Sequence, residues 1–178
     1  MEQQLWEKAV GFHGHACPGL AIGVRAACLV LDWLGAARAQ DEELVCVTEN
    51  DACGVDGIQA ILGCTLGKGN LLYRPTGKQV YTFFARASGK GLRLALRPLP
   101  QDLDRQARMR WILEAPAEEI FTRGEPRFAL PERARLFASV ACALCGESVP
   151  EHKIHLQDGK LVCADCFRSY SRIVETAL

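Results

Sequence analysis

Two pairs of cysteines near the C-terminus carry the clearest chemical signal in this sequence. Each pair has the spacing Cys-x-x-Cys, and seventeen residues separate Cys142/Cys145 from Cys163/Cys166. Two such turns facing each other supply the tetrahedral sulfur cage that structural Zn²⁺ prefers. Two disulfides or a redox motif are the alternatives, but a redox Cys-x-x-Cys normally occurs once, inside a βαβ unit. The spacing therefore predicts a zinc site with all four cysteines as ligands.

A second cluster lies just before an apolar segment that begins at Pro18. Its sequence is His13-Gly14-His15-Ala16-Cys17, with two imidazoles and a thiol at alternate positions. In an extended segment, alternate side chains point the same way, so these three groups can converge. The N-terminus of a helix also lowers the pKa of a thiol. Alternatively, the histidines cap the helix or pack on nearby aromatic residues. The complete set favours a functional site.

Cys53 occupies a comparable position, in a turn after a predicted strand and just before a predicted helix. Partial exposure near backbone N–H donors suits a nucleophilic or metal-binding thiolate. A buried, inert thiol is the common alternative for a free cysteine. The case for a functional Cys53 is stronger if it faces Cys17. Cys28 and Cys46 lie within apolar patterns and are predicted to be structural, whereas the pattern leaves Cys64 undecided.

The glycine-rich segment 63–70 has only a superficial likeness to a phosphate-binding loop. Three residues rather than four separate the first glycines, no Ser or Thr follows Lys68, and a predicted strand comes next. Backbone N–H groups and Lys68 remain a candidate anion site, although a plain turn fits better. His152 and His155 lie between the cysteine pairs. Because four cysteines already fill a tetrahedron, we expect these histidines on the surface.

The elements that must position these residues show both helical and strand patterns. Apolar residues three and four apart predict helices over residues 2–12, 18–34, 55–62, 102–114, 116–121 and 167–178. Alternating or β-branched runs predict strands over residues 44–49, 71–74, 80–86 and 91–97. Residues 122–131 are rich in Gly, Pro and charge and predict a connector. The resulting fold class is α+β, a mostly antiparallel sheet packed with helices over residues 1–135 and a treble-clef zinc finger over residues 136–178.

Composition narrows the class of protein. The formal net charge is zero, so no overall field attracts nucleic acid or a membrane surface. The N-terminus lacks the basic and apolar regions of a signal peptide. Arg25 and Asp32 interrupt the longest apolar stretch, which predicts a buried helix rather than a membrane span. Nine cysteines in a chain without an export signal imply a reducing compartment, so we expect a cytoplasmic protein.

Three ordered segments resemble the signature blocks of the FmdE family, proteins related to the FmdE component of formylmethanofuran dehydrogenase. These segments are residues 13–19, 49–59 and 63–70, and residues 142–166 resemble the family's optional C-terminal finger. The resemblance covers essentially the whole chain. It implies an α+β core, a homodimer, an appended treble-clef finger and a link to methanogenesis and to one-carbon or molybdenum and tungsten enzyme operons.

The resemblance also implies a second site, in the core. The family's recurring polar residues correspond here to His15, Cys17, Cys53 and Asp56. Our first hypothesis is therefore a metalloprotein in which His15, Cys17 and Cys53 bind a transition metal and form the catalytic site. An open coordination position would then act as a Lewis acid or carrier for a one-carbon or metal-cofactor substrate.

Two other functions remain open at this stage. The chain is alternatively a non-catalytic accessory or regulatory component whose finger binds a protein partner in a larger redox enzyme system. Acidic residues offset the sparse basic residues of the finger, so nucleic acid is a less favoured partner. The third hypothesis is thiol redox catalysis by Cys17 with Cys53.

Overall fold

A computed structural model describes residues 2–35 and 38–172. The chain divides into two compact units, Met1–Ala134 and Arg135–Leu178. This division falls one residue before the domain boundary expected from the sequence.

Helices form one layer of the first unit. They are α1 (Glu2–His13), α2 (Pro18–Leu34), α3 (Gly54–Leu62), α4 (Arg105–Glu114) and the short α5 (Ala117–Ile120). Helix α2 begins at Pro18, and its C-cap Gly35 adopts a left-handed conformation with φ 56°. Helix α4 begins later than predicted because the side chain of Asp104 accepts a hydrogen bond from Ala107 N (2.8 Å) and caps the first turn. Among the described helices, none is both long and apolar enough to cross a membrane.

A five-stranded sheet forms the second layer, in the order β2-β1-β3-β4-β5. Its strands are β1 (Leu44–Thr48), β2 (Leu71–Tyr73), β3 (Val80–Ala85), β4 (Gly91–Leu96) and β5 (Phe121–Gly124). Strand β1 pairs with β2 in parallel, and the other pairs are antiparallel. The α+β class with a mostly antiparallel sheet is confirmed. Strand β5 lies largely where a connector was predicted. The sequence did not reveal this strand, because three of its four residues are exposed and its residues do not alternate between apolar and polar.

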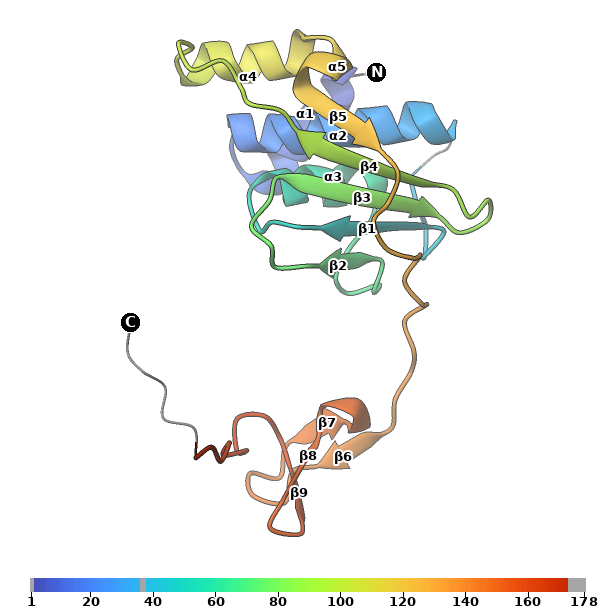
Figure 1. Cartoon of the computed structure of the whole chain (residues 1–178), viewed down its shortest axis with the longest axis vertical. Coiled ribbons are helices and arrows are strands. Elements are labelled where there is room, and N and C mark those ends of the chain that lie inside the picture. Colours follow the sequence, from blue (N-terminus) through green and yellow to red (C-terminus); the bar gives the residue numbers. More distant parts are fainter. Residues whose placement is uncertain (1, 36–37, 173–178) are drawn as a thin grey trace. The chain divides into compact units, whose positions relative to one another are not determined.

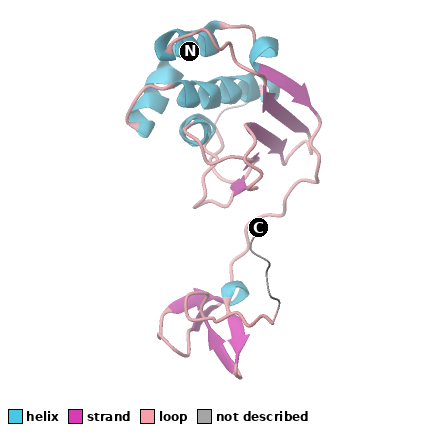
Figure 2. Cartoon of the chain, turned by 60° about the vertical axis from the view of Figure 1, so that its left-hand side comes forward, coloured by secondary structure: helices cyan, strands magenta, loops and turns pink. Residues whose placement is uncertain are grey.

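The helices lie on one face of the sheet (Figures 1 and 2). Alternate strand residues such as Cys46, Tyr81 and Leu94 point toward them and join the main core. The opposite face carries Val45, Val47 and Phe84, which pack under side chains from the segment that follows β5. In Figure 1 this segment passes in front of the sheet. We name residues 125–134 the strap, because they cover the face that lacks helices.

A buried ion pair fixes the end of the strap. Arg86 donates to the carbonyl oxygens of Pro131 (2.9 Å) and Glu132 (3.0 Å). The same guanidinium contacts the Glu42 carboxylate at 3.1 Å. That carboxylate also accepts a hydrogen bond from Ala134 N at 3.2 Å. The strap is therefore anchored to the core by both charge and backbone hydrogen bonds.

The second unit contains two β-hairpins and one short 3-10 helix among its described residues. The hairpins pair β6 (Ser139–Ala141) with β7 (Ser148–Pro150) and β8 (His155–Gln157) with β9 (Lys160–Val162), and the 3-10 helix is Glu151–Lys153. The helix predicted over residues 167–178 is not formed in residues 167–172, and the rest of that prediction lies outside the described residues. The prediction of a treble-clef helix was therefore wrong for the part that the structure describes.

Candidate metal centres

Cys17 and Cys53 stand at the starts of two helices. Cys17 is the N-cap of α2, and its Sγ accepts a hydrogen bond from Leu20 N at 3.3 Å. Cys53 is the N-cap of α3, and its side chain makes no capping hydrogen bond. Each helix start therefore presents one sulfur atom, and cysteine sulfur is a ligand that zinc accepts.

Glycines bring these two helix starts together. A Cβ added to Gly23 of α2 would lie 1.9 Å from the carbonyl oxygen of Gly54. A Cβ on Gly57 of α3 would lie 2.9 Å from the backbone nitrogen of Val24. Both distances are too short for any side chain, so α2 and α3 pack backbone against backbone. Glycines that lie far apart in the sequence thus serve the same role, because each allows the two helices to approach closely.

The core cluster consists of His13, Cys17 and Cys53. One ligand atom from each residue lies within 4.8 Å of the others, and the three residues come from α1, the start of α2 and the start of α3. His13 Nε2 is 3.8 Å from Cys17 Sγ. One nitrogen and two sulfur donors suit a borderline-soft transition metal such as zinc.

A carboxylate orients the His13 ring. Nδ1 of His13 lies 2.6 Å from Oδ2 of Asp56, and the other oxygen of Asp56 accepts from Gln59 Nε2 at 3.3 Å. A carboxylate only accepts, so Nδ1 donates to it, and in the neutral imidazole Nε2 keeps its lone pair on the side of the thiols. This carboxylate–histidine pairing is common behind metal-bound histidines.

His15 does not belong to this three-residue cluster. Its ring packs against the His13 ring at a tilt of 35° with a centroid distance of 4.4 Å, and the residue is exposed. The expected alternation failed because His13 is the last residue of α1 and Gly14 turns the chain with φ 91°. The structure thus brings Cys17 and Cys53 together as expected, with His13 as the adjacent imidazole. His15 as a ligand stays a prediction.

The electrostatics of the thiol pair favour a bound cation. Burial raises the pKa of Cys53, and the hydrogen bond and charge of Cys17 raise it further. Two thiolates this close repel each other unless a cation compensates them. A raised pKa also makes Cys53 a poor nucleophile near neutral pH, which weighs against the redox hypothesis.

The four finger cysteines form the second cluster, again with Sγ atoms within 4.8 Å of one another. Cys145 Sγ and Cys163 Sγ are 3.9 Å apart, and Cys163 N donates to Cys142 Sγ at 3.3 Å. Backbone hydrogen bonds from Cys145, Cys163 and Leu144 lower the pKa of Cys142 to about 6. The first thiolate is thus formed near neutral pH before any metal binds.

The fourth cysteine of the finger behaves differently. Its hydrogen bond with Cys163, followed by burial, raises the pKa of Cys166 to about 12. A cation is needed to hold all four sulfurs as thiolates. The two histidines between the cysteine pairs lie outside the cluster. The His152 ring packs at a tilt against Phe137, with a centroid distance of 3.9 Å, and His155 stacks on Phe167 at 4.4 Å.

The glycine-rich loop is a structural turn rather than an anion site. Lys68 Nζ donates to the carbonyl oxygens of Ala39, Gln40 and Asp41 at 3.2 to 3.4 Å. Its charge therefore closes a neighbouring loop instead of facing a ligand. Cys64, left undecided by the sequence, is fully buried, and burial raises its pKa to about 12. This thiol is structural.

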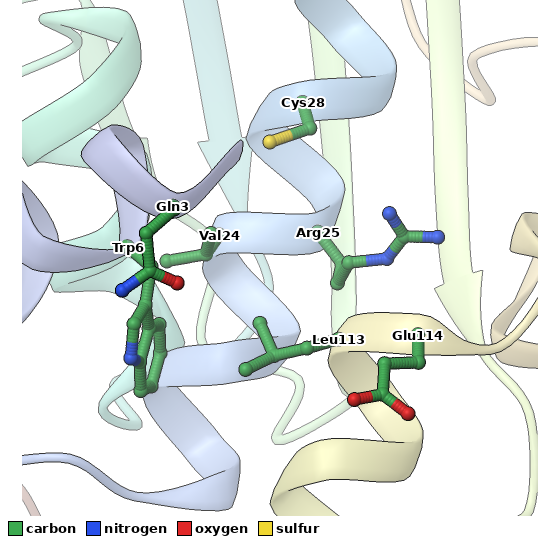
Figure 3. A pocket seen from close by; sticks show the side chains of 7 residues that line it. All are labelled: Gln3, Trp6, Val24, Arg25, Cys28, Leu113 and Glu114. Carbon is green, nitrogen blue, oxygen red and sulfur yellow. The ribbon is translucent and has the colours of Figure 1, made fainter. Parts of the chain in front are cut away.

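A cavity of about 320 Å³ lies among α1, α2 and α4 (Figure 3). Its polar and aromatic lining includes Trp6 from α1, Arg25 from α2 and Glu114 from α4. Arg25 Nη2 donates to the carbonyl oxygen of Ala115 at 2.9 Å, which ties α2 to the end of α4. The cavity was not predicted from the sequence, because its residues are scattered over three helices without a motif.

The fold and the two clusters define a two-unit protein with a thiol- and imidazole-containing α+β core and a four-cysteine finger. The family model described as FmdE, molybdenum formylmethanofuran dehydrogenase operon, matches residues 12–122. The chain belongs to the FmdE family. Residues 135–172 match the prokaryotic dksA/traR C4-type zinc finger, so the four cysteines form a zinc-binding cluster.

Two similar proteins extend the comparison. A protein of Archaeoglobus fulgidus named probable S-adenosyl-L-methionine-binding protein is 29% identical, over 94% of this chain and 53% of its own length. The chain thus spans about half the length of this curated relative. The crystal structure of a tungsten formylmethanofuran dehydrogenase FmdE-like protein from Syntrophus aciditrophicus matches with a TM-score of 0.69 and 23% identity, over 93% of this chain and 91% of that one. This likeness supports the fold.

Proposed function

We propose that the core is a second metal centre, with His13, Cys17 and Cys53 as its protein ligands. The observation that carries this proposal is the convergence of their three ligand atoms within 4.8 Å from separate parts of the chain. Three protein ligands leave one coordination position open, as in catalytic rather than structural zinc sites. When bound, the metal would supply Lewis-acid or carrier chemistry at that position.

The substrate class follows from the family rather than from the cluster. The FmdE description refers to the molybdenum formylmethanofuran dehydrogenase operon. We therefore propose a one-carbon or metal-cofactor substrate, in the setting of methanogenesis-related metabolism. None of the nine cysteines forms a disulfide, which fits a reducing compartment such as the cytoplasm.

Metal analysis of four purified full-length proteins tests the centre: the wild type and the variants Cys17→Ser, His13→Ala and His15→Ala. We expect the wild type to hold one ion in the finger and one in the core. Cys17→Ser and His13→Ala should each lose the core ion, whereas His15→Ala should keep it. If His15→Ala loses the ion and His13→Ala keeps it, the imidazole ligand is His15. Wild-type protein with a single ion under every loading condition would contradict the proposal.

An accessory role through the finger is the second candidate. Leu156 and Leu161 pair across the second hairpin and are 70% and 45% exposed. Ala143 N donates to Leu161 O at 2.8 Å, which brings the backbone before Leu144, itself 55% exposed, against this hairpin. An apolar patch of this kind suits a protein partner better than nucleic acid. A component of a redox enzyme or a second copy of the chain, giving a homodimer, would cover it.

Oligomeric state tests the homodimer form of this candidate. If the patch is the dimer contact, light scattering should show a dimer for the wild type and a monomer for Leu156→Asp. If the wild type is a monomer, the remaining version of this candidate is that the patch binds a different protein. In that case, direct binding to the purified components of formylmethanofuran dehydrogenase is measured with the same variant as control. Binding to neither would reject the accessory role.

Ligand binding in the helical cavity is a third candidate. The curated relative is named for S-adenosyl-L-methionine binding, and the cavity in Figure 3 offers an indole face at Trp6 and a carboxylate at Glu114. A sulfonium cation is attracted by both groups. Calorimetry should show S-adenosylmethionine binding more tightly than S-adenosylhomocysteine, which lacks the cation. Glu114→Gln should remove that preference. Equal affinities for the two compounds would refute this candidate.

A further inference from the structure

One buried hydroxyl near the core cluster makes no hydrogen bond that would stabilise the fold. Tyr81 of β3 is fully buried, and its hydroxyl has no hydrogen-bond partner among the described residues. Leaving a buried donor without a partner is unfavourable, because the group has lost water and gained nothing. Buried orphans of this kind call for an explanation in a ligand, an ion or a second state of the molecule.

Asn50 lies near this hydroxyl and lowers its pKa, but the two side chains do not meet the geometry of a hydrogen bond. Asn50 Nδ2 donates to Lys78 O at 3.1 Å, and its Oδ1 accepts from Ala52 N at 3.2 Å. Burial raises the pKa of Tyr81 well above its usual range, the charges of Cys46 and Cys53 add to the shift, and Asn50 opposes it. The phenol is therefore a protonated donor, and one of the thiols around it is Cys53.

The hydroxyl points to the start of α3. A Cβ added to Gly54, the residue after Cys53, would lie 2.3 Å from the Tyr81 oxygen. Gly19 of α2 faces the other side of Cys53, since a Cβ there would lie 3.1 Å from Cys53 Cβ and 3.6 Å from its Sγ. Tyr81, Cys53 and the first turn of α2 thus lie in one packed layer, where the two helices cross.

We propose that Tyr81 is a positioning residue for the core metal centre, whose hydroxyl donates a hydrogen bond to Cys53 Sγ once the metal holds Cys53 as a thiolate. This inference rests on the metal centre proposed above. A neutral thiol is a weak acceptor, whereas a thiolate accepts a strong, charge-assisted bond. Cys53 makes no capping hydrogen bond, so no backbone donor at the start of its helix competes with the phenol for its Sγ. The hydroxyl is then unpaired in the metal-free protein and paired in the loaded one.

The neighbouring residue offers a matched control. Thr82 is fully buried, and its Oγ1 also has no partner among the described residues. It follows Tyr81 on the same strand, so its side chain points to the opposite face of the sheet, away from the helices. Thr82→Val therefore removes an orphaned hydroxyl on the far face of the sheet, and Tyr81→Phe removes the one that faces the start of α3.

The experiment uses the full chain with its finger first loaded with zinc. Co²⁺ is then titrated into the wild type, Tyr81→Phe and Thr82→Val, with Cys17→Ser as the spectroscopic blank for the core centre. We expect Tyr81→Phe to weaken core Co²⁺ binding about tenfold, as is typical when a partner of a metal ligand is removed. The sulfur-to-cobalt charge-transfer band should move to lower energy, because the thiolate loses a hydrogen-bond donor. Thr82→Val should change neither property.

Urea unfolding of the metal-free proteins completes the test. Both variants should be as stable as the wild type or more stable, because each loses an unpaired buried hydroxyl. Wild-type Co²⁺ affinity and spectrum in Tyr81→Phe would overturn the inference while leaving the metal centre intact. An equal loss of affinity in Thr82→Val would also overturn it. If the wild type shows no core cobalt bands, the proposed centre itself is wrong and the inference falls with it.

Discussion

Replacing Asp56 by asparagine tests whether the charge behind His13 strengthens the core centre. The two side chains are 2.6 Å apart, with His13 11% and Asp56 37% exposed. An amide oxygen still accepts from Nδ1, so Asp56→Asn keeps the orientation of the ring. It removes the negative charge and, with it, the 3.3 Å hydrogen bond that Gln59 Nε2 donates to the other oxygen. Removing such a partner weakens metal binding by about 10- to 100-fold. Because water screens an exposed carboxylate, we expect the lower end of this range, about tenfold or about 1.4 kcal/mol.

Competition against a chromophoric chelator measures this change in the full-length chain, with the finger already loaded. Asp51→Asn is the matched control, because Asp51 is exposed and lies two residues before Cys53. It removes the same charge from the same neighbourhood without touching His13. Asp56→Ala should cost more than Asp56→Asn, since it also frees the ring. An affinity unchanged in Asp56→Asn, or lowered equally in Asp51→Asn, would refute the proposed role of the carboxylate.

Three further predictions concern the scaffold. Gly23→Ala should lower the free energy of unfolding by about 3 kcal/mol through overpacking against Gly54, and should also reduce core metal content; a fully stable variant would contradict the backbone contact. Arg86→Ala should cost about 3 kcal/mol by urea unfolding, because it leaves the buried Glu42 carboxylate unpaired, and a loss below about 1 kcal/mol would argue against the anchor. Burial raises the pKa of Cys64 from 9.0 to about 12, so unfolded chains lose this proton first and stability should fall as pH rises through that interval. In Cys64→Ala, the free energy of unfolding measured with urea should fall less steeply with rising pH than in the wild type. An identical pH dependence would contradict the raised pKa of Cys64.

The sequence predicted which cysteines lie close together better than it predicted the imidazole beside them. Cysteine spacing and helix-start positions are local properties, so they pointed to Cys17 with Cys53 and to the four cysteines of the finger. The choice between His13 and His15 depends on the turn at Gly14, where a positive φ breaks the alternation that an extended segment would have. Strand β5 was missed for a related reason. Exposed residues beside β4 form a strand through pairing alone, and pairing is invisible in a single segment.

The strap also determines where the two units of this protein can be separated. The FmdE match ends at residue 122, yet Phe128 and Leu130 lie on the outer face of the sheet and Ala134 N binds Glu42. A chain cut at residue 122 would expose the apolar outer face of the sheet. It would also remove the backbone groups of the strap that bind the buried, oppositely charged side chains of Arg86 and Glu42. Any gene rearrangement, proteolytic cut or expression design that removes the finger must therefore leave residues 125–134 with the core. The segment that joins the finger to the core is therefore also part of the packing of the core itself.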